Sequence, residues 1–271
     1  MSGPEATGAI GTALRDITAR GLPAELWRPL LTGASEIDPA QFDRAARGPV
    51  VVVVPHPDDE TLGAGGLLQR LAGPEPTLVF VTDGAAGYPG STPGQQAELA
   101  VLRRAEAHAA LQALGRSEAR AVFLDVPDGT VADVEAELGD RLRPFFTSAR
   151  LVLAPWPGDP HPDHQAVGRA AAETAKRVGV ELWQYPIWMR HSIRPGDPRV
   201  EAARLRVVRL TAAEQAVKRA AIETHRSQLR SPIAGYGPVL PEHVLELFAD
   251  GVEPFFLPSG SSGPAAPGAL R

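Results

Sequence analysis

Five consecutive valines, Val50 to Val54, are followed by a turn that carries one imidazole and three carboxylates, between His56 and Glu60. An unbroken run of β-branched residues is typical of a strand that is buried on both faces of a sheet. Open α/β sheets bind their ligands just beyond the carboxyl ends of such strands. The sequence therefore predicts a buried strand with a binding site at its carboxyl end.

Similar apolar runs recur along the chain and alternate with segments of helical periodicity. This alternation predicts a Rossmann-like α/β fold, in which helices cover both faces of a mainly parallel sheet. The glycines at 63, 65 and 66 are expected to let the first of these helices pack closely on the sheet. The expected strands are 50–54, 77–82, 121–126, 151–154, 181–185 and 205–210, and the expected helices are 61–71, 95–114, 131–148, 212–229 and 242–248.

We expect one main domain over residues 49–256 of the 271-residue chain. Residues 1–48 are interpreted as a helical extension that packs on this core, with a helix over 13–31 that Gly21 and Pro23 interrupt. Residues 257–271 are rich in Ser, Gly and Pro and are expected to form a flexible tail.

Composition limits the partners and ligands that the chain is expected to take. Cysteine is absent, so a metal ion would have nitrogen and oxygen ligands. The net charge of −5 and the lack of a basic cluster make nucleic acid an unexpected partner. No apolar window approaches the ~20 residues of a transmembrane helix, and the first residues lack a signal-peptide pattern, so a cytoplasmic protein is expected. Assembly into a homo-oligomer is left open.

A second polar cluster, His161 to His164, follows the strand expected at 151–154. Because parallel strands end at the same edge of a sheet, this cluster and the turn at His56 can meet there. Two histidines and one carboxylate, with a fourth position open to water, form a recognised catalytic zinc site. Any one of these residues could be a turn or capping residue, but the two clusters together favour a metal site.

The two clusters resemble the signature of the PIG-L/LmbE-like de-N-acetylases, whose members remove acetyl groups from N-acetylglucosamine conjugates. The family's Pro/Ala-His-Pro-Asp-Asp-Glu turn is present as Pro55 to Glu60, and its His-Pro-Asp-His motif is present as His161 to His164. The resemblance covers roughly residues 50–228. It implies a cytoplasmic enzyme that acts on a small N-acetylated substrate with one Zn²⁺ per chain, although another divalent transition metal would also suit the site.

Carried over residue by residue, the resemblance makes His56, Asp59 and His164 the zinc ligands and Asp58 the general base. His161 would be the general acid or, in its positively charged form, would stabilise the oxyanion. Its expected orienting partner is the carboxylate at position 163, Asp163. Either Asp58 or His161 could then protonate the leaving amine.

Weaker matches to the family suggest substrate contacts at Asp83, Arg103 and His225. Each has a structural alternative. Asp83 could cap a helix or a turn, and Arg103 lies one helical turn from Glu106, where a surface ion pair would be ordinary. His225 could be a buried structural histidine.

Two further functions are compatible with these residues. Clustered aspartates at strand ends also serve Mg²⁺-dependent phosphoryl transfer, but Mg²⁺ prefers oxygen ligands, and the several histidines argue against a phosphoesterase. A non-catalytic, zinc-containing sugar-binding protein would not need Asp58 or His161. The favoured function is therefore a zinc-dependent amidohydrolase that acts on a linear amide, with zinc as a Lewis acid and Asp58 as the base for the attacking water.

Overall fold

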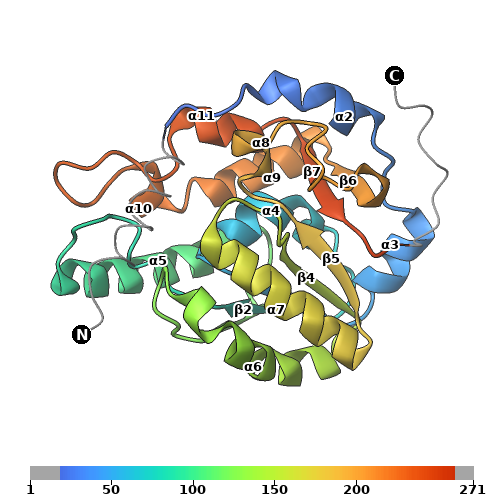
Figure 1. Ribbon diagram of the computed structural model, residues 1–271, viewed down its shortest axis with the longest axis horizontal. Coiled ribbons are helices and arrows are strands. Elements are labelled where there is room, and N and C mark those ends of the chain that lie inside the picture. The colour runs from blue at the N-terminus through green and yellow to red at the C-terminus, as the bar shows by residue number, and fades with distance from the viewer. Residues whose placement is uncertain (1–18, 260–271) are drawn as a thin grey trace.

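A seven-stranded sheet forms the centre of the computed structural model, which describes residues 19–259 (Figure 1). The strand order is β3-β2-β1-β4-β5-β7-β6. The first five of these are parallel, whereas β7 runs antiparallel to both of its neighbours. The strands are β1 (Val50–Val54), β2 (Thr77–Phe80), β3 (Arg120–Phe123), β4 (Leu151–Pro155), β5 (Glu181–Tyr185), β6 (Leu205–Arg209) and β7 (Val252–Phe256).

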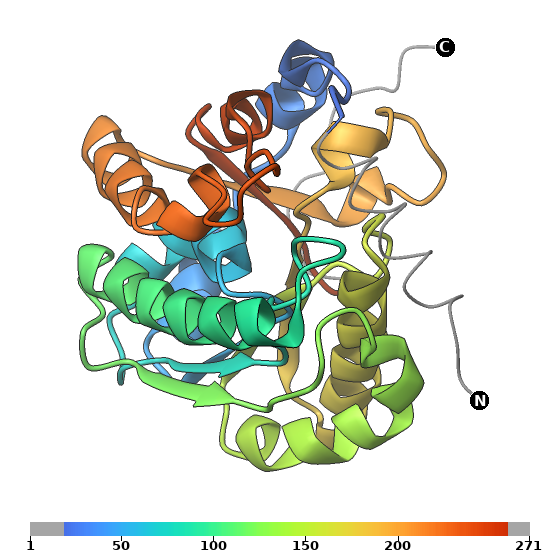
Figure 2. The same cartoon turned by 90° about the vertical axis from the view of Figure 1, so that its left-hand side faces the viewer.

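Helices cover both faces of this sheet, which confirms the predicted Rossmann-like α/β fold (Figure 2). Helices α4, α5 and α9 contribute to the core on one face, and α6 and α7 contribute to the core on the other. The α-helices are α2 (Arg28–Gly33), α3 (Pro39–Ala46), α4 (Asp59–Gln69), α5 (Pro93–Ala113), α6 (Glu135–Thr147), α7 (Pro162–Val178), α8 (Met189–Ser192), α9 (Ala212–Ile222), α10 (Arg226–Leu229) and α11 (Glu242–Leu245). The 3-10 helices are η1 (Ala24–Leu26), η2 (Val131–Val134), η3 (Ala202–Arg204) and η4 (Glu246–Phe248).

The five valines of β1 are all buried because alternate side chains enter opposite cores. Val50, Val52 and Val54 pack in one core, while Val51 and Val53 pack in the other. A strand with both faces covered cannot alternate apolar with polar residues, which is why its sequence is a continuous apolar run. The run of five valines is therefore explained by the two helical layers that cover the sheet.

Several elements differ from the sequence prediction, including a strand and two helical segments of the main domain. Strand β7 was not predicted, because Pro254 lies inside it and a proline argues against a central strand. The helix expected over 212–229 is two helices, since the chain leaves the helical path between Ile222 and Arg226. Helix α7 begins inside the second polar cluster, at Pro162, and was not separately predicted.

The described part of the amino-terminal extension packs on the sheet through short helices. Trp27 is fully buried, and its Nε1–H donates to the carbonyl oxygen of Ile193 at 3.0 Å. Glu36 forms a single bridge to Val207 of β6. The first part of the helix expected over 13–31, and most of the tail expected over 257–271, lie outside the described residues. Between residues 19 and 259, no helix is both long and apolar enough to cross a membrane.

Gly63 permits the close approach of α4 to the sheet. A Cβ atom at this position would lie 2.4 Å from Cδ2 of Tyr185. That ring cannot withdraw freely, because its hydroxyl donates to the carbonyl oxygen of Val53 at 2.7 Å. Gly66 is equally crowded by Leu210, at 2.2 Å. The expectation that small residues bring α4 close to the sheet is therefore confirmed at these two glycines.

Replacing Gly63 by alanine is expected to lower the free energy of unfolding by about 1–3 kcal/mol, because the overpacked methyl group outweighs the gain in helix propensity. Urea unfolding would measure the change. Gly33→Ala is the matched control, since no heavy atom lies within 4 Å of its added Cβ. An alanine at 63 that is as stable as the parent protein would contradict the packing argument.

Candidate metal centre and active site

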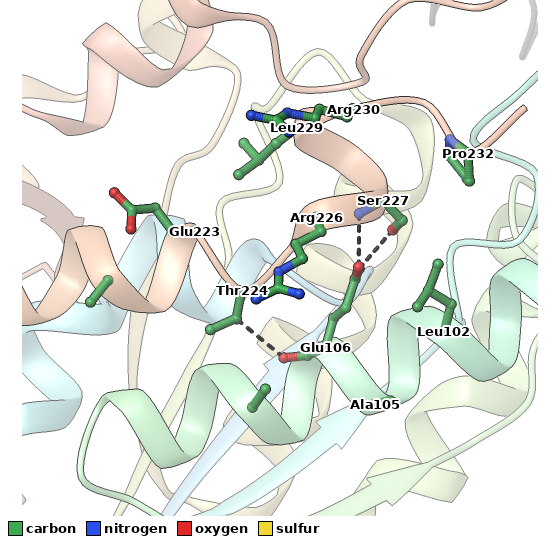
Figure 3. Close-up of a pocket in the computed structure, with 12 residues that line it drawn as sticks. Leu102, Ala105, Glu106, Glu223, Thr224, Arg226, Ser227, Leu229, Arg230 and Pro232 are labelled. Atoms are coloured by element: carbon green, nitrogen blue, oxygen red, sulfur yellow. Dashed lines mark hydrogen bonds between the residues drawn. The ribbon is translucent and has the colours of Figure 1, made fainter. Parts of the chain in front are cut away.

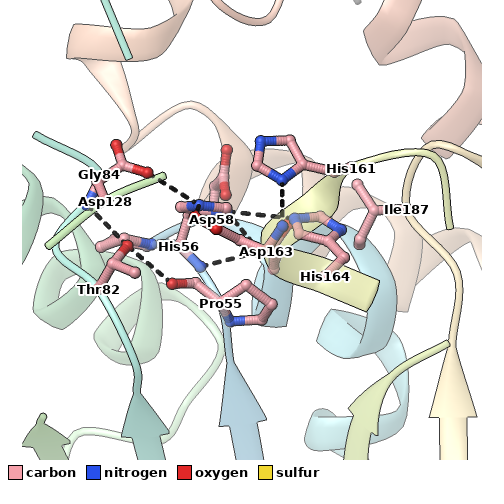
Figure 4. Close-up of polar contacts among 12 residues, drawn as sticks. Pro55, His56, Asp58, Thr82, Gly84, Asp128, His161, Asp163, His164 and Ile187 are labelled. Atoms are coloured by element: carbon pink, nitrogen blue, oxygen red, sulfur yellow. Dashed lines mark hydrogen bonds and ion pairs between the residues drawn. The ribbon is translucent and has the colours of Figure 1, made fainter. Parts of the chain in front are cut away.

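The candidate site lies where the strand order reverses. The chain passes from β1 outward to β2 and β3, and then returns to place β4 on the other side of β1. The connections that leave β1 and β4 therefore diverge, and they open a crevice at the carboxyl edge of the sheet. His56 follows β1, whereas His161 and His164 follow β4, and Figure 4 shows these side chains converging above the strand ends.

Three ligand atoms form a nearly equilateral triangle. Nδ1 of His56 is 3.4 Å from Oδ2 of Asp59, and Nε2 of His164 is 3.2 Å from each of these atoms. Nitrogen and oxygen ligands at about 2.0–2.1 Å from a tetrahedral zinc ion lie roughly 3.3–3.4 Å apart. The triangle thus has the dimensions of one face of a tetrahedral site, and it leaves the fourth position open.

A carboxylate faces the second ring nitrogen of each histidine in this triangle. Nε2 of His56 lies 3.1 Å from Asp128 Oδ1 and 3.2 Å from Asp163 Oδ2. Nδ1 of His164 lies 3.3 Å from Asp159 Oδ1. Metal-binding histidines commonly donate their other N–H to a carboxylate, which fixes the ring and directs the remaining lone pair at the metal. Both histidines have this arrangement, so the residues present fit a divalent cation.

The carboxylates around the triangle stabilise positive charge. Burial alone would lower the pKa of His164, but Asp59 and Asp159 outweigh burial and raise this pKa to about 9. Burial likewise opposes charge on His56, yet Asp128, Asp163 and Asp59 raise its pKa well above the usual value. Conversely, burial would raise the pKa of Asp59, but His164 and His56 hold it far below its ordinary range. A divalent cation would take the place of these protons.

Two other groups of potential ligands share His56. One group adds His161 and His164, and the other adds Asp128 and Asp163. In the second group, both carboxylates meet the outer nitrogen of His56, on the side away from the triangle. We therefore favour His56, Asp59 and His164 as the ligand set, because only this set gives each histidine an outer carboxylate.

Asp58 has a strained backbone and a carboxylate without a protein partner. Its φ of 150° is rarely adopted by residues other than glycine, and such strain is often found at functional sites. Although Asp58 precedes α4, its side chain makes no capping hydrogen bond. Among the described residues, no hydrogen bond or ion pair involves this carboxylate. Burial and the neighbouring Asp59 raise its pKa well above the usual value, which suits a group that takes up a proton.

His161 and Asp163 are close together, but not as expected. The carboxylate of Asp163 contacts Nε2 of His56 and accepts from the backbone N–H of Gly129 at 2.8 Å. It is the backbone N–H of Asp163 that donates to Nδ1 of His161, at 3.2 Å. Helix α7 begins at Pro162, so this contact caps the amino end of the helix. The Asp163 side chain points instead to His56. The expected orienting carboxylate is therefore replaced by a main-chain donor.

This contact sets the protonation of His161. Burial, His164 and His56 lower the pKa of His161 to about 3, so the ring is neutral. Because Nδ1 accepts a hydrogen bond, the single ring proton resides on Nε2. The structure thus differs from the expectation of a positively charged His161. Its neutral Nε2–H remains able to donate a hydrogen bond to a developing oxyanion.

Arg103 is a buried cation. From the sequence, we expected either a contact with substrate or a surface ion pair with Glu106. The ion pair is wrong, because the Glu106 carboxylate accepts instead from the backbone N–H and hydroxyl of Ser227, at 2.7 and 2.6 Å (Figure 3). The guanidinium is 2% exposed, and its Nε and Nη2 atoms have no hydrogen-bond partner among the described residues. Gly84 and Gly87 lie directly against it.

Asp83 and His225 have protein partners. Asp83 pairs with Arg104 at 3.3 Å and accepts from the backbone N–H of Ala85, so it serves a turn. His225 is fully buried, and its Nε2 lies 3.2 Å from the hydroxyl of Thr61. A side chain without exposed surface cannot touch substrate here, so His225 supports α4 and is not the expected substrate contact. A contact from Asp83 to substrate stays a prediction.

Two carboxylates of the site were not among the sequence-based candidates. Asp128 follows β3 within the weaker family match, and Asp159 lies between β4 and α7. Both come shortly after the carboxyl end of a parallel strand, and this position was the available signal. The partner of Asp128 is His56, far away in the chain, whereas Asp159 lies close to its partner His164 but outside both motifs.

Fold and site together define an α/β protein with a candidate His/Asp metal centre at the switch point of its parallel sheet. Residues 51–175 match the family model described as PIG-L, GlcNAc-PI de-N-acetylase. Over these residues the chain is similar to the PIG-L/LmbE-like deacetylases, which confirms the resemblance that its two polar motifs indicated.

Two curated relatives match about half of the chain. One is a diacetylchitobiose deacetylase from Thermococcus kodakarensis, 30% identical over 48% of this chain and 50% of its own length. The other is a probable N-acetyl-alpha-D-glucosaminyl L-malate deacetylase 2 from Bacillus cereus, 29% identical over 49% of this chain and 63% of its own length. The match thus spans only half to two thirds of these relatives.

Solved structures extend the likeness to most of the fold. The conserved protein TT1542 from Thermus thermophilus is 27% identical, with a TM-score of 0.54, over 82% of this chain and 96% of that chain. The 4-carboxy-2-hydroxymuconate hydratase GalB has the same fold, at 20% identity and a TM-score of 0.52, over 83% of this chain and 100% of that one. Because the fold is compatible with different reactions, the function has to be argued from the site.

Proposed function

We propose that the protein is a zinc-dependent hydrolase that removes an acetyl group from an N-acetylated amino sugar or a related small conjugate. The observation that carries the proposal is the triangle of His56, Asp59 and His164 next to the unpaired carboxylate of Asp58. The names of the two curated relatives, both deacetylases of N-acetylated sugar compounds, support the substrate class.

His56, Asp59 and His164 would hold the zinc ion, which supplies a Lewis acid for the amide carbonyl and makes water a stronger acid. Asp58 takes the proton of the attacking water. Its buried position and raised pKa allow the carboxylate to accept that proton and hold it. General base help of this kind contributes typically about 10²–10⁴-fold to the rate.

His161 donates its Nε2–H to the oxygen of the acyl carbonyl as negative charge develops there. Loss of this proton would leave an imidazolate, so His161 is a poor acid for the leaving amine while Nδ1 accepts from the backbone. Asp58, which has just gained a proton, is the better donor. The sequence left open whether Asp58 or His161 protonates the leaving amine. We propose that Asp58 does.

Arg103 lowers the pKa of the proposed general base, Asp58. Its positive charge lowers the pKa of Asp58, against the larger effects of burial and of Asp59. Replacing Arg103 by methionine removes this charge, so the pKa of Asp58 should rise. Since the base works only when deprotonated, the acid limb of the kcat/KM profile should move to higher pH, and activity at low pH should fall most.

A pH series of kcat/KM for Arg103→Met would test this shift. Arg143→Met is the control, because Arg143 is exposed on α6. An acid limb that stays in place in Arg103→Met would show that this guanidinium does not act on the base. A uniform loss at every pH would assign Arg103 to substrate binding alone.

The decisive test of function is acetate release by the zinc-loaded protein from a panel of N-acetylglucosaminides, each matched by the same sugar with a free amine. Acetate from at least one N-acetylated compound, with none from the protein stripped of metal, is the expected result. Tight zinc binding without acetate release from any compound would favour the non-catalytic sugar-binding alternative. Release of phosphate from sugar phosphates with Mg²⁺ would favour the phosphoesterase.

A further inference from the structure

Asp159 is a fully buried carboxylate with four partners, two in the second polar motif and two in the segment that follows β5. Its Oδ2 accepts from the backbone N–H groups of Ile187 and Trp188, at 2.9 and 2.8 Å. Its Oδ1 accepts from the backbone N–H of His161 at 3.2 Å and lies 3.3 Å from Nδ1 of His164. One side chain thus joins the second polar motif, a member of the ligand triangle and the segment that follows β5.

The backbone of Asp159 is also held in place, because both its N–H and its carbonyl oxygen make hydrogen bonds. The backbone N–H of Asp159 donates to the carbonyl oxygen of Trp156 at 3.1 Å. Its own carbonyl oxygen accepts from Nε2 of Gln165, on the first turns of α7, at 2.9 Å. A charged group that is fully buried is costly unless it is hydrogen-bonded and paired, and here three amide donors and an imidazole fulfil that condition.

The three amide donors leave one side of Oδ1 directed at His164. Nδ1 of His164 is itself buried and makes no hydrogen bond within the described residues, and the carboxylate that faces it, at 3.3 Å, is that of Asp159. A neutral imidazole carries one ring proton, so its position decides which nitrogen can bind a metal. A carboxylate at Nδ1 favours the proton there and leaves the lone pair of Nε2 directed into the triangle.

We propose that Asp159 is the positioning residue of the metal centre: it selects the tautomer of His164 that binds the cation through Nε2, and it couples that ring to the Ile187–Trp188 segment. This inference rests on the proposed metal centre. It assigns a role to a residue outside the two family motifs, and it makes the segment after β5 part of the support for the site.

Asp159→Asn keeps two of the three amide contacts and changes the atom that faces His164 and the backbone N–H of His161. The asparagine carbonyl oxygen can still accept from the amides of Ile187 and Trp188. Its NH₂ group then faces His164 and donates where the carboxylate accepted, which favours a proton on Nε2 and opposes metal binding. Zinc affinity, measured by competition with a chromophoric chelator, is expected to fall by about 10–100-fold, the usual effect of removing such an outer partner.

Glu253→Gln is the matched control. Glu253 is also a buried carboxylate that accepts from two backbone N–H groups, those of Gly66 and Leu67, but it pairs with Lys218 away from the triangle. Its substitution should lower thermal stability and leave zinc affinity within about twofold of the parent. Zinc affinity that is unchanged in Asp159→Asn, or equally reduced in both variants, would overturn the proposal.

A second measurement does not depend on the folding of any variant. Nitrogen-15 NMR of the zinc-loaded parent protein should show the His164 ring protonated at Nδ1 and coordinated through Nε2. Coordination through Nδ1 would overturn the proposed role of Asp159 while leaving the metal centre intact. A parent protein that binds no zinc would instead overturn the metal centre of the proposed function, and the inference with it.

Discussion

Asp58→Asn is expected to lower kcat by at least about 10²–10⁴-fold while the protein keeps its zinc. The carboxamide has nearly the same size as the carboxylate but cannot take a proton from water. The Asp58 carboxylate makes no hydrogen bond or ion pair to the described part of the protein, so its substitution should cost little stability. Initial rates of acetate release, zinc content and thermal unfolding would be measured on the same preparation.

Asp140→Asn provides the comparison for this variant. Asp140 is exposed on α6, with 76% of its side chain accessible, and its substitution should leave rate and zinc content unchanged. An Asp58→Asn protein with parental kcat would remove Asp58 from the mechanism. If the variant instead lost its zinc, Asp58 would be a ligand, and the set of three derived from the distances would be incorrect.

His164→Ala is expected to abolish tight zinc binding, from one ion per chain to a small fraction, and with it nearly all acetate release. His164 contributes one corner of the triangle, and its pKa is raised to about 9, against burial, by Asp59 on the side of the triangle and Asp159 on the outer side. Removing the ring leaves only two ligand atoms, on His56 and Asp59. Zinc content after dialysis, measured by atomic absorption, is the primary readout.

His108→Ala is the control for histidine removal, because His108 is an exposed residue of α5 that contacts Phe123 and lies in neither motif. It should retain both zinc and activity. A His164→Ala protein that still held one zinc ion per chain would favour the alternative group with Asp128 and Asp163 around His56. Adding excess zinc to His164→Ala distinguishes weakened from lost binding, since weakened binding would restore part of the rate.

Much of the fold could be predicted because its signals are local. The run Val50–Val54 has the predicted bounds of β1, and Glu181–Tyr185 has those of β5. In both cases, a short apolar run between turn residues suffices. Strand β7 escaped prediction because Pro254 contradicts the local pattern, and its place between β5 and β6 depends on strands far away in the chain.

The candidate site, too, could be predicted only in part from the sequence. The residue types and their positions at strand ends predicted a metal site, and the family resemblance then selected His56, Asp59 and His164 as its ligands. The structural alternative for Arg103, an ion pair with Glu106, does not form, although the two residues are one helical turn apart, because Ser227 offers the Glu106 carboxylate two donors. Helical spacing makes an ion pair possible, but competing partners from another helix decide whether it forms.

The sequence by itself determined the residue types of the candidate site, which are imidazoles and carboxylates with no thiol, and the strands that bring both motifs to one edge of the sheet. The tertiary structure decided which ring nitrogen faces which carboxylate, that a backbone N–H and not Asp163 orients His161, and that Asp159 supports His164. The physical reason is that each side chain has several competing partners, some of them far away in the chain, and only the folded structure decides which of them it contacts. Residues a few positions apart are related by local geometry, whereas His56 and His164, 108 positions apart, meet only through the register of β1 with β4.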